Sequence, residues 1–65
     1  MIVYDNLWAL MKKKKVSQYR LNQQGISHST LTRLKRNQSV SVDTIDRLCE
    51  ILECRVEEVM EYVRK

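Results

Sequence analysis

The 65-residue sequence predicts an all-α fold, a small bundle of five short helices that forms one domain over residues 1–65. Two observations predict this class. Apolar residues recur with the spacing of a helix face along most of the chain. The sequence also has no proline and only one glycine, Gly25, so little interrupts its helical segments.

The first helix is predicted over residues 6–14, with Asp5 as its N-cap. Its apolar residues follow the i, i+3, i+4 spacing, namely Leu7, Leu10 and Met11. Trp8 is expected in the core, because this helix is otherwise short of apolar side chains. The preceding residues, Ile2 to Tyr4, fit either a short strand or an extended arm.

The second and third helices are predicted over residues 18–24 and 28–36, with Ser17 and Ser27 as their N-caps. Gly25 ends the second helix because glycine adopts a left-handed backbone without steric cost, and Asn37 ends the third because asparagine tolerates the same conformation. The side chains expected to point inward are Tyr19, Leu21, Ile26, Leu31 and Leu34. Two helices joined by a few residues around a glycine form a helix-turn-helix unit.

Two further helices are predicted in the C-terminal part of the chain. Ser41 is expected to cap the fourth, whose apolar stripe consists of Val42, Ile45, Leu48, Cys49 and Leu52. The fifth is expected to repeat this stripe with Val56, Val59, Met60 and Val63. Both stripes would face the common core of the bundle.

Charge is distributed unevenly along the chain, whose net charge is +4. Residues 11–39 hold eight of the twelve Lys and Arg residues and no Asp or Glu. Residues 40–65 hold four basic residues against seven acidic ones. One part of the molecule is therefore suited to bind an anion, and the other part is not.

The outward face of the third helix lies in the basic part. With Leu31 and Leu34 pointing inward, the 100° step of a helix gives this face His28, Ser29, Thr32, Arg33 and Arg36. Arginine binds guanine bidentately, serine and threonine reach base edges or the thymine methyl, and histidine donates to a guanine or a phosphate. We therefore predict that His28, Ser29, Thr32 and Arg33 contact bases in a major groove. The alternative is a solvated helix face that is basic but binds nothing.

Residues that flank this helix are suited to hold a phosphate backbone. Gln18 lies at the amino end of the second helix, where backbone N–H groups favour an anion. The other predicted phosphate contacts are Arg36, Gln38, Ser39 and Lys13. Lys13 belongs to the run Lys12 to Lys15, which has a simpler interpretation as a solvated cationic helix end that complements the helix dipole.

An ordered set of segments carries a resemblance to a known family: VSQYRL, GISHSTLTRLKRN, VSVDTIDRLCEIL and CRVEEVMEY. Together they resemble the Cro/C1-type, XRE-like helix-turn-helix regulators of phages and mobile elements, over essentially the whole chain. The resemblance implies a lambda-repressor-like DNA-binding domain whose third helix reads bases, at positions that match His28, Ser29 and Arg33. It also implies that Gln18 grips phosphate.

One position departs from the pattern of that family. The family usually has a small residue, often alanine, after the leucine of the second helix, followed by three residues and the turn glycine. Here Asn22 follows Leu21, and the turn is one residue shorter. The departure bears on the angle at which the third helix would lie in a groove.

Other chemistries have little support in the sequence. The single histidine has no nearby carboxylate to orient it, so neither an enzyme nor a small-molecule substrate is expected. One histidine and two cysteines make a poor zinc site, and we expect no metal or cofactor. The side chains of Cys49 and Cys54 are expected on different faces, as reduced and partly buried thiols. No apolar run reaches the roughly 20 residues of a membrane span, so a cytoplasmic protein is expected.

The sequence therefore predicts a transcriptional regulator, acting as a repressor, whose partner is double-stranded DNA. A homodimer is expected through an apolar patch at the end of the chain, made by Val59, Met60, Tyr62 and Val63. The alternative for this patch is that the fifth helix only closes the monomer. A second hypothesis for function is a protein-binding adaptor that uses the surface of the fourth and fifth helices on the same fold.

Overall fold

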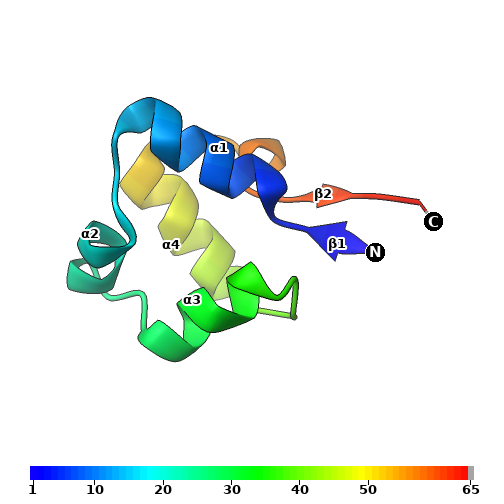
Figure 1. The fold of residues 1–65 in the computed structure, drawn as a ribbon, viewed down its shortest axis with the longest axis horizontal. Coiled ribbons are helices and arrows are strands. Elements are labelled where there is room, and N and C mark those ends of the chain that lie inside the picture. Colours follow the sequence, from blue (N-terminus) through cyan, green and yellow to red (C-terminus); the bar gives the residue numbers. More distant parts are fainter. Residues whose placement is uncertain (65) are drawn as a thin grey trace.

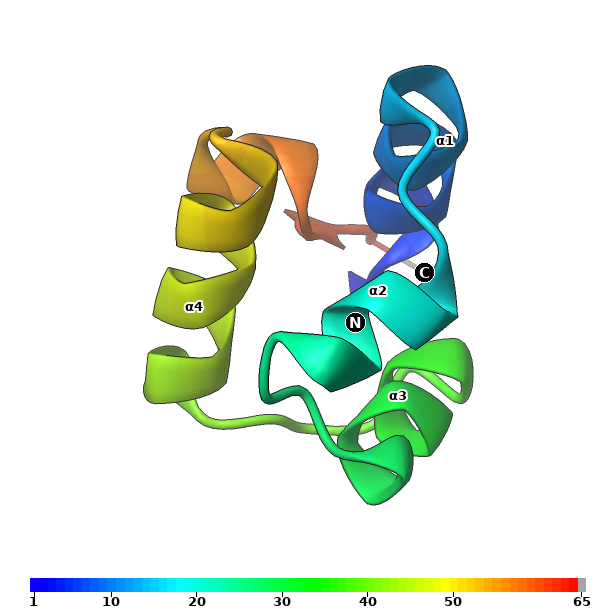
Figure 2. The ribbon, with the colours of Figure 1, turned by 90° about the vertical axis from the view of Figure 1, so that its left-hand side faces the viewer.

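The computed structural model describes residues 1–64 and contains four α-helices, one 3-10 turn and two short strands. Their order is β1 (Ile2–Val3), α1 (Asp5–Lys14), α2 (Gln18–Gln23), α3 (His28–Lys35), α4 (Val42–Leu52), η1 (Val56–Glu58) and β2 (Glu61–Tyr62). In Figure 1, α1 and α3 lie on opposite sides of the molecule, and the two strands pair at one end. Figure 2 shows that α4 lies opposite the side formed by α1, α2 and α3.

Three serines begin three of the helices, as predicted. The hydroxyl oxygens of Ser17, Ser27 and Ser41 accept hydrogen bonds from backbone N–H groups three residues later, at 3.1, 3.2 and 3.1 Å. Each satisfies one of the N–H groups that a helix leaves without a partner in its first turn. The prediction for α1 was wrong by one residue, because Tyr4 is the N-cap and Asp5 is the first helical residue.

Left-handed residues end the helices. The predicted ones are confirmed, because φ is 104° at Gly25 and 54° at Asn37. Two more were not predicted: Lys15 ends α1 with φ 59°, and Glu53 ends α4 with φ 50°. Sequence reasoning misses them because neither residue type favours this conformation.

The core is built from every helix and from both ends of the chain. Its buried residues are Val3, Tyr4, Leu7, Met11, Leu21, Ile26, Leu31, Leu34, Ile45, Leu48, Leu52 and Val59. Trp8 is half-buried and packs against this core.

Four residues expected in the core are exposed instead, namely Tyr19, Val42 and, from the predicted fifth helix, Val56 and Val63. Tyr19 is 71% exposed, because Leu21 is the residue of α2 that points inward and a side chain two positions earlier lies on the opposite face. Val42, the first residue of α4, is 83% exposed.

The predicted fifth helix is absent from the described residues. After the short turn η1 the chain becomes extended, and β2 pairs antiparallel with β1, with Ile2 opposite Tyr62 and Val3 opposite Glu61. Two further hydrogen bonds extend the pairing. The amino group of Met1 donates to the carbonyl of Val63 at 3.0 Å, and the backbone N–H of Val63 donates to the carbonyl of Met1 at 2.7 Å. The spacing of the apolar residues from Val56 to Val63 fits a helix. Such spacing is a local pattern, and it carries no information on whether a strand at the other end of the chain can pair with this segment. Ile2 and Val3 thus form a strand rather than an arm.

The two cysteines are free and half-buried, as expected, but the Cys54 thiol interacts with that of Cys49. Glu53 turns the chain back, so that the N–H of Cys54 donates to the carbonyl of Cys49 at 3.1 Å. Burial and the neighbouring Cys49 thiol raise the pKa of Cys54 to about 11. The expectation that the two side chains leave on different faces was therefore wrong.

Candidate nucleic-acid interface

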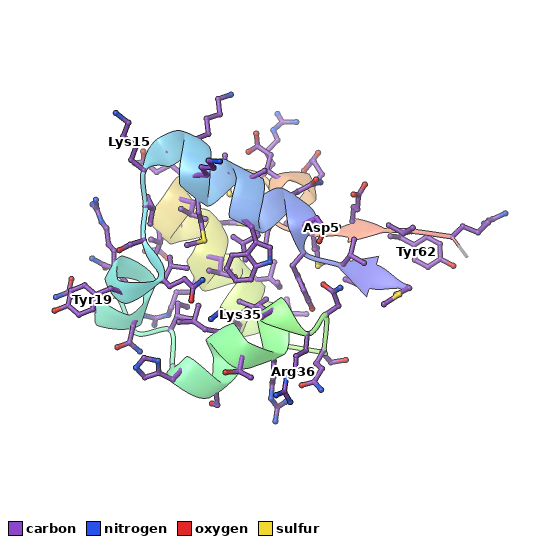
Figure 3. The ribbon with its side chains drawn as sticks, viewed as in Figure 1. Asp5, Lys15, Tyr19, Lys35, Arg36 and Tyr62 are labelled. Atoms are coloured by element: carbon purple, nitrogen blue, oxygen red, sulfur yellow. The ribbon has the colours of Figure 1, made fainter. Side chains whose placement is uncertain are left out.

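The outer face of α3 carries the polar residues that sequence periodicity placed there. Leu31 and Leu34 are buried, whereas all five predicted outward residues are exposed: His28, Ser29, Thr32, Arg33 and Arg36. Figure 3 shows Arg36 on the side of α3 that faces away from α1. The four predicted base contacts thus share one exposed helix face.

Hydrogen bonds within α3 determine what this face offers to a ligand. The hydroxyl of Thr32 donates to the carbonyl of His28 at 3.0 Å, so that toward a ligand it presents an acceptor oxygen and a methyl group. The hydroxyls of Ser27 and Ser29 are 3.1 Å apart, and that of Ser27 donates to Thr30 at 2.9 Å. The first turn of α3 is therefore a linked set of hydroxyl groups.

The carboxyl end of α3 is anchored to the start of α1 by Tyr4. The phenol of Tyr4 donates to the carbonyl of Gln38 at 3.0 Å, and its backbone N–H donates to Oδ1 of Asn37 at 3.1 Å. Because Tyr4 is only 3% exposed, both bonds lie at the edge of the core. Sequence reasoning missed this role for Tyr4 and for the side chain of Asn37, since the two residues are far apart in the chain.

The amino end of α3 is anchored by the turn that follows α2. The backbone N–H of Ile26 donates to the carbonyl of Leu21 at 3.1 Å, and that of Gly25 donates to the carbonyl of Asn22 at 3.1 Å. The side-chain amide of Asn22 donates to the carbonyl of Ile26 at 2.9 Å. Asn22 therefore helps to close the turn with a side-chain bond that an alanine at this position could not make.

Four of the five predicted phosphate contacts lie close to the outer face of α3, and the fifth, Lys13, does not. Gln18 begins α2, while Gln38 and Ser39 lie in the loop after α3, and all three are exposed. Arg36 caps the carboxyl end of α3. These four residues lie on the elements that flank the outer face of α3.

Lys13 is not brought together with α3. It lines a shallow groove between α1 and η1, together with Glu57 and Glu58. Figure 3 shows the neighbouring Lys15 at the far side of the molecule from Arg36. This placement favours the simpler interpretation of Lys13 as part of a solvated cationic helix end.

Three exposed residues near α3 were not predicted as site residues. Arg20 and Tyr19 lie on α2, and Lys35 is the last residue of α3. The amide of Gln23 donates to the phenol of Tyr19 at 3.2 Å, which holds the exposed ring along α2. The basic charge of Arg20 and Lys35 was visible in the sequence, but their orientation was not.

Exposed apolar side chains gather at the end of the molecule where the strands pair. They are Met1, Ile2, Val42, Tyr62 and Val63. A groove beside them runs between the strands and the loop after α3, and is lined in part by Met1, Ile2, Gln38, Val42 and Met60. Of the predicted dimer residues, Tyr62 and Val63 are exposed and Met60 is half-buried. Val59 is fully buried, so its side chain belongs to the core and not to this surface.

Within residues 1–64, no cluster of three or more His, Cys, Asp or Glu side chains is arranged to hold a metal ion. Over the same residues, no helix combines the length and the apolar character that crossing a membrane requires.

Comparison with known proteins gives two similarities. The model of the Cro/C1-type HTH DNA-binding domain family matches residues 6–65. Among solved structures, the crystal structure of the transcriptional regulator VanUg, Form II, is similar with a TM-score of 0.90 and 28% sequence identity. The similarity covers 98% of this chain and 87% of that chain. No match was found among curated proteins.

Proposed function

The chain belongs to the family of Cro/C1-type helix-turn-helix DNA-binding domains, and we propose that it is a sequence-specific transcriptional regulator that reads the major groove of double-stranded DNA with α3. One observation carries the proposal. Four side chains suited to base edges share the exposed face of a helix that is anchored at both ends. A fixed helix can present these groups in a constant register, which sequence recognition requires.

The contacts that specify sequence are assigned to His28, Ser29, Thr32 and Arg33. The guanidinium of Arg33 matches the O6 and N7 acceptors of guanine, and the ring of His28 can donate to a guanine or a phosphate. Thr32 uses its proton within the helix, so it suits a thymine methyl or an amino group on a base edge. Ser29 is positioned beside them in the first turn.

The contacts that position the protein are assigned to Gln18 on one side of α3 and to Arg36, Gln38 and Ser39 on the other. Such residues bind phosphate and fix register without reading sequence. Lys13 is a weaker candidate because it lies beside two glutamates across the molecule. If Lys13 contacts phosphate, Lys13→Ala lowers affinity for all duplexes alike and flattens the salt dependence.

We also propose that the protein acts as a homodimer. Met1, Ile2, Val42, Tyr62 and Val63 are exposed apolar residues, the kind of surface that a symmetric dimer buries. In such dimers the two reading helices lie about 34 Å apart, one helical turn of DNA. A dimer bound to a promoter in this way would repress transcription by blocking the access of RNA polymerase.

Fluorescence anisotropy tests the function directly. Labelled random duplex is titrated with protein at low and at moderate salt, and we expect binding that weakens steeply as salt rises. No binding to random duplex even at low salt would contradict the proposal. It would then favour the adaptor hypothesis, in which the surface of α4, η1 and β2 binds a protein.

A further inference from the structure

The α2–α3 turn is held from a second side by α4, through Arg47. The guanidinium of Arg47 donates to the backbone carbonyl of Gln24 at 3.1 Å, across 23 residues of sequence. Gln24 is the C-cap of α2, and its carbonyl is one of the groups that a helix end leaves without a partner. A cation at this position also complements the dipole of α2.

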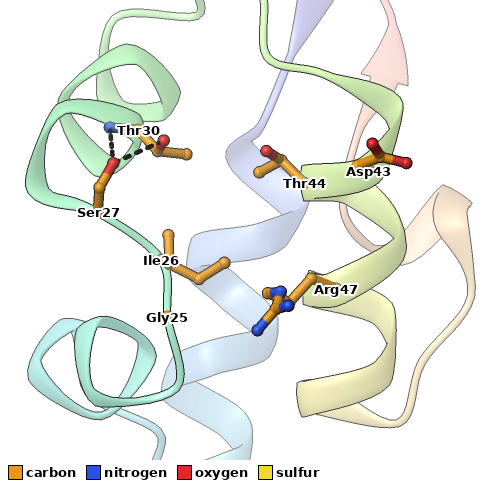
Figure 4. Close-up of a pocket in the computed structure, with 7 residues that line it drawn as sticks. All are labelled: Gly25, Ile26, Ser27, Thr30, Asp43, Thr44 and Arg47. Atoms are coloured by element: carbon orange, nitrogen blue, oxygen red, sulfur yellow. Dashed lines mark hydrogen bonds between the residues drawn. The ribbon is translucent and has the colours of Figure 1, made fainter.

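Gly25 and Arg47 are fitted to each other. A Cβ on Gly25 would lie 2.9 Å from Nη1 of Arg47, so the guanidinium would have to shift from its present position. Figure 4 shows the Arg47 side chain extending from α4 toward the chain at Gly25 and Ile26. The lack of a side chain at Gly25 thus serves two purposes, the left-handed backbone and the space for the guanidinium.

The Arg47 side chain is exposed, but the helix that carries it is packed in the core. Its neighbours on α4, Ile45 and Leu48, are both buried in the core. The two side-chain bonds to the turn hold carbonyls on either side of Gly25: Arg47 holds that of Gln24, and Asn22 holds that of Ile26. Ile26 is followed directly by Ser27, the N-cap of α3.

From this geometry we infer that Arg47 is a positioning residue for DNA recognition, which acts by fixing the turn that sets the direction of α3. The effect of Arg47 on DNA recognition rests on the proposed function, whereas its bond to the Gln24 carbonyl does not. Arg47 is not assigned a contact with a base. Its loss frees the turn, so that α3 samples several directions and the specific contacts weaken more than the contacts to phosphate.

The test compares Arg47→Met, which keeps the stem and removes the donors, with Arg47→Lys, which keeps the charge. Arg55→Met is the matched control, because it removes the same charge from an exposed arginine before η1. Anisotropy is measured with a duplex selected by the wild-type protein and with random duplex. Amide hydrogen exchange of Gly25 and Ile26 is measured by NMR without DNA.

We expect Arg47→Met to weaken binding to the selected duplex about fivefold, while its affinity for random duplex stays equal to that of Arg55→Met. Arg47→Lys should recover most of the loss, and exchange at Gly25 and Ile26 should be faster in Arg47→Met. An equal loss on both duplexes, or unchanged exchange in the turn, would overturn the inference. If Arg47→Met does not fold, Arg47→Gln is measured in the same way.

The two proposals fail in different ways. If the wild-type protein binds no duplex at all, the proposed function falls, and the exchange rates of Gly25 and Ile26 still decide whether Arg47 holds the turn. If the wild-type protein binds its selected duplex and Arg47→Met binds it equally well, only the role of Arg47 falls.

Discussion

Tyr4 shows how much one residue contributes to the placement of α3. Its phenol and its backbone N–H bind the two residues that follow the helix, Gln38 and Asn37, and its ring is buried. A buried tyrosine generally has a partner for its hydroxyl, and here that partner is the loop beside the proposed DNA surface. The residue therefore links the core of the protein to the carboxyl end of α3.

We expect Tyr4→Phe to lower the free energy of unfolding by about 1–2 kcal/mol, because the carbonyl of Gln38 loses its donor in a partly buried place. Tyr62→Phe is the matched control, since Tyr62 is 66% exposed and its change should cost no more than about 0.5 kcal/mol. Urea unfolding of the two variants measures both values. Equal stability of the two variants would show that the Tyr4 bond adds nothing.

The Cys54 thiol is expected to react slowly. Burial first, and then the neighbouring Cys49, raise its pKa to about 11, so little thiolate is present near neutral pH. Its alkylation by iodoacetamide in the wild-type protein, followed by mass spectrometry of the peptide that holds Cys54, should be slow at pH 8 and accelerate up to about pH 11. In the unfolded chain the thiol ionises at lower pH, so this group also makes the folded state less stable as pH rises from about 9 to 11. Alkylation at pH 8 as fast as in the urea-unfolded chain would contradict this.

At the scale of elements, the starts of helices were easier to predict from the sequence than their ends. The starts at Ser17, Ser27 and Ser41 were predictable, because serine caps have a local mechanism. The ends at Lys15 and Glu53 were not, because those residues adopt the left-handed conformation only under the constraint of packing.

Non-local pairing explains the largest error of prediction. The stripe from Val56 to Val63 has helical spacing, but only Val59 of its predicted core residues is fully buried. The chain extends after η1 because β1 offers a partner, and that information lies about sixty residues away. The outward face of α3 was predictable because two buried leucines fix it. The contacts of Tyr4, Asn22 and Arg47 were not, since each depends on tertiary structure.

Glu53→Gly is expected to stabilise the protein by about 0.5–1 kcal/mol, because glycine relieves the left-handed strain at the end of α4 at some cost in unfolded-state entropy. Glu50→Gly is the control on the same helix. It lies on the exposed face of α4, where glycine should destabilise by about 1 kcal/mol. Thermal unfolding compares the two, and a loss of stability in both variants would refute the account of this helix end.

At the scale of the whole molecule, charge and apolar surface are arranged around α3. Residues 11–39, which include α2 and α3, hold eight basic residues and no acid, whereas residues 40–65 hold seven acids and four basic residues. The exposed apolar residues gather at the end where the strands meet the loop after α3. A second copy that docks on the exposed strand residues Tyr62 and Val63 would leave the outer face of α3 uncovered.

Val42→Glu tests this arrangement, because it places a charge in the apolar surface at a residue that the monomer does not bury. We expect the wild-type protein to dimerise and Val42→Glu to weaken the dimer at least about tenfold in sedimentation equilibrium. Val56→Glu, at the exposed residue that begins η1, is the control and should leave the dimer unchanged. A dimer that tolerates Val42→Glu would place the interface elsewhere.

The central claim is that α3 reads DNA sequence, and selection from a randomised duplex with wild-type protein and with Arg33→Ala tests it most directly. The wild-type protein should enrich a motif of two inverted half-sites about one helical turn apart. Arg33→Ala should lose preference at one base pair of each half-site, by about 1–3 kcal/mol, and keep the rest. Identical motifs from the two proteins, with Arg33→Ala folded, would contradict the assignment of α3 as the reading helix.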